Sequence, residues 1–450
     1  MSRPDSYPDH VTPYDRFALS DTQIEDLLAT GEQQRELIAY FGTQEYRELA
    51  TLARKAARVS TETAPLVFVV PGIMGSQLGL LRQAPLPNDV LWLDPIDIEV
   101  GRLSALRLPD AAPIVSLGAV LYSYLRLKLH LRAAGFAAVF HDYDWRLGID
   151  ELGRAFAKRL RAQKHDRVMV VAHSMGGLVA RAALALPGTE KVARIVLMGT
   201  PNFGSFAPVQ ALRGTYAVVR KIARLVQSSS AETMAAEIFN TFPSLYHMLP
   251  LATRNGGPDL LEPGEWPQSN PRPRAELLAS ARCVQSALAP ADHRFAVVVG
   301  VGEETVTAVT RRKDEFVYTI TRRGDGTVPA ISAELPGALM HYATVAHSDL
   351  TRDRVVAAAV IDLLRKGTTR RLPRSWAGRS RAEARISDRQ LRRTHVQKVD
   401  WAGLEPEQRR RFLQNLNEPP ELKLAVPAAR SLRRKAKRSS KVKRSSRRAP

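Results

Sequence analysis

Between Pro65 and Lys366 the sequence alternates short apolar runs with helical patterns, and this alternation limits the fold more than any other feature. Continuous apolar runs of this kind are typical of strands that are buried on both faces. The runs are Leu66 to Val70, Ala137 to Phe140, Val168 to Val171, Ile195 to Met198 and Phe295 to Val301. Helical patterns at 117–134, 150–163, 175–186 and 351–365 separate or follow them. The sequence therefore predicts an α/β fold, with a mostly parallel sheet covered by helices.

The regions on either side of this pattern have a different character. Residues 1–62 contain a polar arm and then two or three amphipathic helices, interrupted at Gly31 and Gly42, which we interpret as an appendage. Residues 63–366 form the predicted α/β domain, and its strand pattern lapses at about 206–290. An insertion of that length after a strand indicates a cap or lid. Residues 367–450 are predicted to be an Arg-rich extension that ends in a disordered basic tail.

The net charge of +21 over 450 residues comes almost wholly from this extension. From Arg365 to Pro450 there are 27 Lys and Arg against 7 Asp and Glu, which leaves 39 basic and 38 acidic residues in the rest of the chain. Residues 429–448 carry 11 basic residues, no acidic residue and no aromatic residue. Such a run is either merely solvated or attracted to anionic lipid, at about 1 kcal/mol per basic residue near the surface. Nucleic acid is a third alternative, bound without sequence specificity because no aromatic side chain is available for base stacking.

Cys283 is the only cysteine, so no disulfide can form within the chain. The first residues are polar and rich in proline, without the apolar segment of a signal peptide. No apolar run approaches the roughly 20 residues that a membrane span requires. We therefore expect a cytoplasmic protein, with peripheral attachment to a membrane through the tail as an alternative.

Ser174 is the strongest candidate for a catalytic residue. It lies in the segment AHSMG (172–176), between a predicted strand and a predicted apolar helix, which is the context of a nucleophile elbow. Ala172 stands where this pattern usually has glycine, but alanine is still small enough for a sharp turn. Without this context, an ordinary turn serine would be the better interpretation.

A serine nucleophile needs a histidine base and a carboxylate, which α/β-hydrolases supply later in the chain. Asp325 lies in GDGTVP (324–329), after the strand-like segment FVYTITRR, and His347 follows another strand-like segment. Taken alone, an aspartate in such a segment more often only stabilises a turn. His341 competes with His347 as the base. His341 lies within its strand, and His173 is directed away by the elbow, so we favour His347.

An oxyanion hole requires two backbone N–H groups near the nucleophile. One is expected from Met175, the residue after the serine, and the other from the loop after the first strand. That loop follows Pro71-Gly72, and we favour Ile73 as its donor. Read as structure alone, Pro-Gly is a common turn.

Several motifs together resemble the lecithin:cholesterol acyltransferase family, with its phospholipid:diacylglycerol acyltransferase and phospholipase relatives. They cover residues 65–365 in the family's order: VVPGIMGSQL, WLD at 92–94, YDWR at 143–146, AHSMGG, GTPNFGS at 199–205, PSLYHMLP at 243–250, GDGTVP and AHSDL. The resemblance implies an α/β-hydrolase fold, a triad of Ser174, Asp325 and His347, and Ile73 and Met175 as oxyanion donors. It also suggests substrate contacts for Met74 and Trp92, although Trp92 is equally explained as a core residue.

The leading hypothesis is therefore a serine-dependent O-acyltransferase acting on lipid esters through an acyl-enzyme. A lipase or phospholipase that uses water as the acceptor is the first alternative, and a non-catalytic binding protein tethered by its tail is the second. The histidines show no metal-ligand spacing, and neither a P-loop nor a dinucleotide fingerprint is present, so no metal or cofactor is expected. In the plasma member of the family a disulfide holds the lid. This sequence cannot form that disulfide, so the resemblance implies nothing about how its lid behaves.

Overall fold

The computed structural model describes residues 12, 20–60, 63–83, 86–110, 112–378, 383–394 and 396–414. Their centre is a six-stranded sheet with the strand order β11-β8-β7-β6-β1-β5, in which every neighbouring pair is parallel. The strands are β1 Leu66–Val70, β5 Ala137–Phe140, β6 Val168–His173, β7 Val192–Met198, β8 Phe295–Gly300 and β11 Leu339–Ala343. The predicted α/β fold with a mostly parallel sheet is confirmed.

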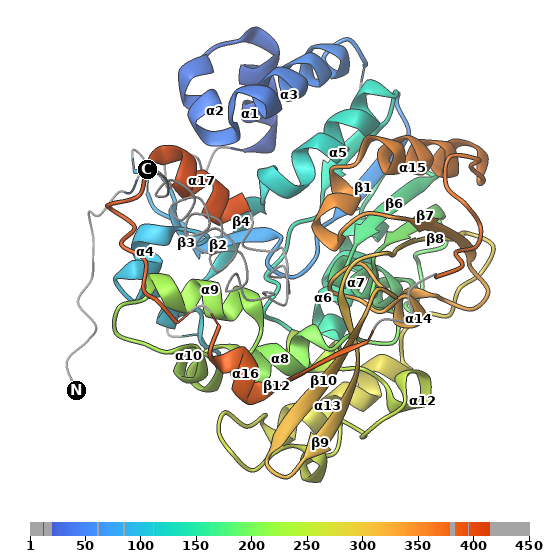
Figure 1. Ribbon diagram of the computed structural model, residues 1–450. Coiled ribbons are helices and arrows are strands. Elements are labelled where there is room, and N and C mark those ends of the chain that lie inside the picture. The colour runs from blue at the N-terminus through green and yellow to red at the C-terminus, as the bar shows by residue number, and fades with distance from the viewer. Residues whose placement is uncertain are drawn as a thin grey trace, which may run out of the picture. The chain divides into compact units, whose positions relative to one another are not determined.

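The sheet divides the apolar core into two parts because successive side chains of a strand point to opposite faces. In β1, Leu66, Phe68 and Val70 belong to one buried cluster. Val67 and Val69 belong to the other. Helices α6 and α7 pack on the first face and α5 and α15 on the second (Figure 1). These helices are α5 Leu121–Ala133, α6 Ile149–Arg161, α7 Met175–Leu184 and α15 Arg354–Lys366.

A helical insertion of the predicted kind lies between β7 and β8. It contains α8 Ala207–Leu212, α9 Ala217–Leu225, α10 Ala231–Glu237, α11 Pro243–His247, α12 Ala252–Asn255 and α13 Ala275–Ser286, with short 3-10 helices η3 Phe239–Thr241 and η4 Pro263–Glu265. Its apolar side chains, such as Val219 and Phe242, belong to the same buried cluster as Phe68 of β1, on the first face of the sheet. The insertion is therefore packed on the body as a cap.

Three N-terminal helices, α1 Asp21–Thr30, α2 Gln34–Phe41 and α3 Thr43–Ala56, pack beside α5 (Figure 1). Leu28 and Leu49 are buried in the same cluster as Leu125 of α5. Around this apolar contact, Arg126 of α5 forms an ion pair with Glu48, at 2.9 Å. The helices thus share an apolar core with the second face of the sheet.

Two small antiparallel sheets complete the fold, and the sequence analysis predicted only one of their strands, β10. One sheet has the order β3-β2-β4 and the other β12-β10-β9. The strands are β2 Ser76–Leu80, β3 Asp89–Trp92, β4 Val115–Ala119, β9 Thr305–Arg312, β10 Glu315–Thr321 and β12 Ala384–Ser387. The remaining helices are α4 Pro95–Glu99, η2 Arg102–Leu106, α14 Ala330–Ala333, η5 His347–Thr351, α16 Asp388–Arg392 and α17 Pro406–Gln414.

The segment after residue 366 does not stand wholly apart from the α/β domain. β12 pairs with β10, and α16 follows it directly. Leu391 and Trp401 are buried in the same cluster as Phe68 of β1. The predicted boundary at 366 therefore marks the end of α15, while the part of the extension up to Trp401 adds to the core of the folded body.

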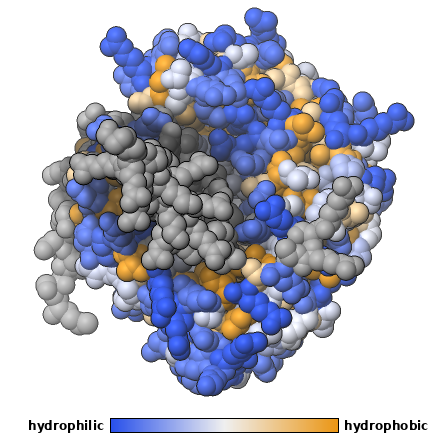
Figure 2. All heavy atoms as spheres, in the orientation of Figure 1, coloured by the Kyte–Doolittle hydropathy of each residue, from blue (hydrophilic) through white to orange (hydrophobic). Residues whose placement is uncertain are grey.

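On the face shown in Figure 2, hydrophilic residues cover most of the coloured surface and apolar residues form separate patches. Among the described residues, no helix is both long and apolar enough to cross a lipid bilayer. The basic run at 429–448 lies outside the described residues. The expectations about its disorder and its binding to anionic surfaces stay predictions.

Candidate active site

Ser174 occupies a sharp turn between β6 and α7. Its backbone has φ 54° and ψ −128°, a left-handed conformation that non-glycine residues seldom adopt. A Cβ atom on Gly176 would lie 2.3 Å from the carbonyl oxygen of Pro71, so only glycine allows this close approach. The turn has the strain and the close packing that define a nucleophile elbow.

The structure brings the three predicted triad residues together. Nε2 of His347 lies 3.0 Å from Oγ of Ser174, and Nδ1 lies 2.7 Å from Oδ2 of Asp325. Because a carboxylate only accepts hydrogen bonds, Nδ1 carries the proton of the neutral ring, and Nε2 is free to accept the Ser174 proton. His347 begins η5, shortly after β11.

Asp325 reaches this site by a route that the sequence did not indicate. It follows β10, which belongs to a separate antiparallel sheet, but the chain then returns to the end of β8, where Glu303 bridges to Asp325. Oδ1 of Asp325 accepts hydrogen bonds from the amides of Thr327 (3.0 Å) and Val328 (2.7 Å). These bonds fix the carboxylate, which is 1% exposed, so that Oδ2 faces the imidazole.

The two other candidate histidines lie where the prediction placed them. His341 is buried within β11, where it pairs with Val298, and its Nδ1 lies 3.2 Å from the carbonyl oxygen of Leu372. His173 ends β6, and its ring contacts the backbone of His347 rather than the Ser174 hydroxyl. Neither ring is in a position to replace His347 as the base.

His173 nevertheless links the loop after β1 to the loop that carries His347. Its Nε2 lies 3.0 Å from the carbonyl oxygen of His347, so Nε2 carries the proton and Nδ1 accepts from the Tyr124 hydroxyl at 3.0 Å. The same hydroxyl accepts the amide proton of Gly72 at 2.8 Å. Burial and the neighbouring His347 lower the pKa of His173 well below its usual value, which keeps the ring neutral. The chain of bonds joins the Gly72 loop to the loop that carries His347, and no motif indicated Tyr124 as a site residue.

The two predicted oxyanion residues lie on different segments, Ile73 in the loop after β1 and Met175 at the start of α7. Ile73 lies in the cavity wall beside Ser174. Met175 is the first residue of α7, and its amide therefore has no acceptor within the helix. A Cβ atom on Gly72 would lie 2.8 Å from Cβ of Ser174, so glycine lets this loop approach the nucleophile. The arrangement presents both amides as candidate donors to a developing oxyanion.

Trp92 takes the second of its two predicted places, in the core. It is 1% exposed and does not line the cavity beside Ser174. Its Nε1 donates to the carbonyl oxygen of Met74 at 3.1 Å, and its ring packs edge-on against Trp145, with centroids 5.3 Å apart. Trp145 in turn donates to the carbonyl oxygen of Ser76 at 3.0 Å. The tentative substrate contact of Trp92 is thus replaced by support of the oxyanion loop from behind, while Met74 does line the cavity.

Tyr143 and Arg146, from YDWR, also have supporting positions. Tyr143 donates to the carbonyl oxygen of Pro71 at 2.5 Å. Arg146 is fully buried and forms ion pairs with Asp110 and Asp144, both at 2.6 Å. This segment fixes the start of the oxyanion loop from the carboxyl end of β5.

A cavity of about 870 Å³, including its mouth, opens at Ser174. The triad histidine and the oxyanion loop form one side of it. Most of the opposite wall comes from the cap and is apolar, with contributions from Ala207, Pro208, Ala211, Tyr216, Val218, Leu245 and Met248. Within the described residues, no group of His, Cys, Asp and Glu side chains could hold a metal ion. The site thus combines the hydrogen-bonded series Ser174, His347 and Asp325 with an apolar chamber.

Comparisons with known proteins agree with this fold class. Residues 149–306 match the family model described as a PGAP1-like alpha/beta domain, which covers the elbow and the cap. No curated protein matches the chain. With the parallel sheet and the elbow, this match defines an α/β-hydrolase fold.

Solved structures with a partial likeness include one complex, one lipase and one phospholipase. The Tle4-Tli4 complex is similar at 15% identity and a TM-score of 0.46, over 67% of this chain and 98% of that one. Bacillus licheniformis lipase BlEst2 in mature form is similar at 13% identity and a TM-score of 0.37, over 69% of this chain and 95% of that one. Phospholipase PlaB from Legionella pneumophila is similar at 10% identity and a TM-score of 0.34, over 68% of this chain and 60% of that one.

Proposed function

We propose that this protein is a serine-dependent acyl-transfer enzyme that acts on lipid esters. The observation that carries the proposal is the hydrogen-bonded series Ser174, His347 and Asp325, with distances of 3.0 and 2.7 Å, at the end of an apolar cavity. A serine hydroxyl becomes a useful nucleophile when a histidine, oriented by a carboxylate, accepts its proton. The apolar wall of the cavity suits the hydrocarbon chain of an acyl group.

In the proposed reaction, Oγ of Ser174 attacks the ester carbonyl carbon while Nε2 of His347 takes the hydroxyl proton. The Ile73 and Met175 amides stabilise the negative charge on the carbonyl oxygen. Collapse of the intermediate breaks the bond to the alcohol, which leaves with the proton from His347. The acyl group remains as an ester on Ser174. An incoming hydroxyl then repeats the sequence in reverse and releases the acyl product.

The acyl acceptor distinguishes the two forms of the proposal. The resemblance to the lecithin:cholesterol acyltransferase family favours an alcohol, and we propose O-acyl transfer on that ground. Hydrolysis, with water as the acceptor, is the alternative. Acyl transfer and hydrolysis use the same acyl-enzyme, so only their products distinguish the two reactions.

Product analysis with a phosphatidylcholine labelled in its acyl chains is the test. We expect the label to move to an added alcohol, whether a sterol, a diacylglycerol or a fatty alcohol, with some free fatty acid as a side product. Label found only in fatty acid, at every acceptor concentration, would make the protein a phospholipase. Label that stays in the phospholipid, and in a triglyceride used as a second donor, would contradict lipid-ester chemistry altogether.

Removing the Tyr124 hydroxyl by Tyr124→Phe is expected to lower kcat about 10-fold while KM changes little. The ring that lines the cavity remains, but the Gly72 amide and His173 Nδ1 lose their partner. A hydrogen bond of this kind contributes about 1 kcal/mol, or more when a buried group is left unsatisfied. Steady-state kinetics with a medium-chain ester measures the effect. Tyr122→Phe, on the same helix but outside the cavity, is the matched control, and an equal loss in both variants would contradict the assignment.

A further inference from the structure

The corner between α8 and α9 forms much of the part of the cavity wall that the cap supplies. Within 12 consecutive residues it contributes Ala207, Pro208, Ala211, Tyr216 and Val218. Ala207, Pro208 and Ala211 belong to α8, Tyr216 immediately precedes α9, and Val218 lies in its first turn. A shift of this corner would therefore change the width of the apolar chamber without moving Ser174.

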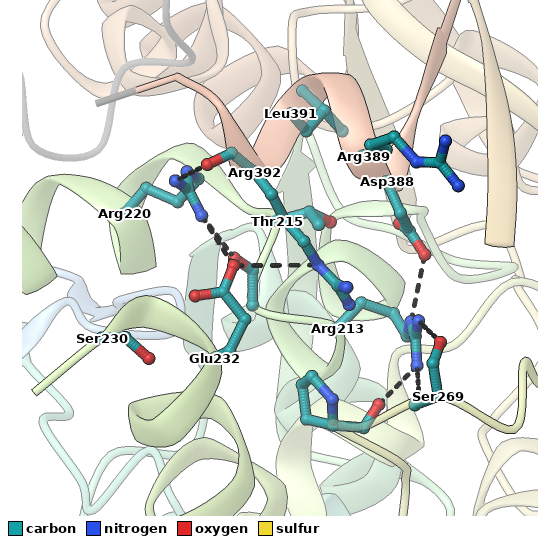
Figure 3. A network of polar contacts seen from close by, with 12 residues as sticks. Arg213, Thr215, Arg220, Ser230, Glu232, Ser269, Asp388, Arg389, Leu391 and Arg392 are labelled. Atoms are coloured by element: carbon teal, nitrogen blue, oxygen red, sulfur yellow. Dashed lines mark hydrogen bonds and ion pairs between the residues drawn. The ribbon is translucent and has the colours of Figure 1, made fainter. Parts of the chain in front are cut away.

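A buried ion pair fixes this corner to the extension beyond the α/β domain (Figure 3). Arg213 follows α8 directly, and its Nε donates to Oδ2 of Asp388, the first residue of α16, at 3.1 Å. Both side chains are at most 1% exposed. The same guanidinium donates to the carbonyl oxygen of Pro271 at 2.6 Å and to the Ser269 hydroxyl at 3.0 Å. Every polar group of the pair is thus satisfied, which a buried ion pair requires if it is not to destabilise the fold.

Asp388 also connects the corner to the sheet beneath it. Its Oδ1 accepts a hydrogen bond from the Tyr318 hydroxyl at 2.8 Å, and Oδ2 accepts the Phe316 amide at 3.3 Å. Tyr318 and Phe316 are buried residues of β10, the strand that leads to Asp325. One carboxylate therefore positions the cavity wall relative to the segment that carries the triad aspartate.

The extension holds α9 along its length as well. Arg220 of α9 donates to the carbonyl oxygens of Thr394, at 2.7 Å, and of Arg392, and pairs with Glu232 at 3.1 Å (Figure 3). Lys398 donates to three carbonyl oxygens at or after the C-terminal end of α9, among them those of Ala223 and Ser229, both at 2.8 Å. A cation at that end of a helix is favourable because the last carbonyls have no partner within the helix.

From these contacts we infer that residues 388–394 and 396–399 act as a strap that sets the shape of the acyl chamber, with Asp388 and Arg213 as positioning residues for acyl-chain length. The inference rests on the proposed function, because it assigns a specificity to the same cavity. Loosening the strap should let the α8–α9 corner move, which weakens the binding of long chains more than that of short ones.

The test compares Asp388→Asn with the unaltered protein on nitrophenyl esters of 4 and 12 carbons. Asparagine keeps the shape of the side chain but removes the charge that compensates Arg213. We expect the ratio of kcat/KM for 12 carbons over 4 carbons to fall about 10-fold, within the range that one or two methylenes contribute in an apolar pocket. Arg389→Gln, at the neighbouring exposed position whose side chain is drawn away from the ion pair in Figure 3, should leave the ratio unchanged.

A second variant covers the case in which Asp388→Asn fails to fold. Lys398 is exposed, so Lys398→Met removes its contacts with α9 without leaving a buried charge unpaired, and should lower the ratio in the same direction. Binding of dodecanoate and hexanoate to Ser174→Ala protein, with and without Lys398→Met, measures the chamber without turnover. An unchanged ratio and unchanged dodecanoate affinity in folded variants would overturn the strap. Absent turnover with normal dodecanoate binding would instead contradict the proposed function.

Discussion

Replacing Ser174 with alanine is expected to lower the turnover of lipid esters by about 10⁶-fold, to the level that binding and the oxyanion amides sustain without a nucleophile. The substitution removes only the hydroxyl that lies 3.0 Å from Nε2 of His347. Alanine keeps the Cβ atom, so the packing against Gly72 is retained. Steady-state rates with a medium-chain ester and with phosphatidylcholine measure the loss, and a thermal melt shows that the fold is preserved.

Covalent labelling makes the same test independent of substrate choice. A fluorophosphonate should modify Ser174 in the folded protein, and peptide mass spectrometry should find the adduct on that residue alone. Ser286→Ala, at an exposed position on α13, is the matched serine control and should retain both labelling and turnover. Turnover that persists in Ser174→Ala would refute the assignment. A folded protein that takes up no label would favour a non-catalytic binding protein.

Five of the six strands of the central sheet were predictable as apolar runs because they are largely buried on both faces, unlike the edge strand β11. Such strands are continuous apolar runs, and the predicted runs at 66–70 and 137–140 coincide with β1 and β5. The elbow was predictable for a related reason, since a strand, a serine between small residues and an apolar helix follow one another directly in AHSMG. Local sequence determines these features, and no distant contact is needed to recognise them.

Features that depend on distant contacts could not be predicted from the sequence. β2 mixes polar and apolar residues, and its pairing with β4 joins residues as far apart in the sequence as Ser76 and Ala119. Trp92 illustrates the same difficulty at the site, because a tryptophan near a candidate loop can face either the cavity or the core. Its hydrogen bond to the Met74 carbonyl places it in the core. Tyr124 lies in a helical pattern, and only tertiary packing brings its hydroxyl to Gly72.

The extension shows how charge patterning can conceal a structural role. Its Arg-rich composition indicated an extension outside the α/β domain, yet Asp388, one of its few acidic residues, is buried against Arg213 of the cap. A single buried carboxylate has no signature in composition or periodicity. Asp388 contacts Arg213, 175 positions earlier in the sequence, and also Tyr318. Only the folded chain shows that these three side chains meet.

Replacing Asp325 with asparagine is expected to lower kcat about 10⁴-fold, the loss seen when a triad aspartate of a serine protease is changed in this way. Asp325 Oδ2 holds Nδ1–H of His347 at 2.7 Å and stabilises the imidazolium that forms when Nε2 takes the Ser174 proton. Asparagine has no negative charge, and its amide nitrogen favours the tautomer in which Nε2 carries the proton. Such a ring cannot accept the serine proton. The amides of Thr327 and Val328 can still bond to an oxygen in the variant, so the turn should persist.

The rate of fluorophosphonate labelling separates a lost triad function from a general loss of structure. In Asp325→Asn, labelling of Ser174 should slow in parallel with kcat, whereas the melting temperature and the affinity for dodecanoate should change little. Asp349→Asn is the matched control, because Asp349 lies two residues after His347 but its side chain is half exposed and is 3.9 Å from Arg352, a weak contact. If Asp325→Asn retained most of its kcat, or if Asp349→Asn caused the same loss, another group would have to orient His347. The fixed position of Asp325, with two amides on one oxygen and the imidazole on the other, makes the large and selective loss the expected result.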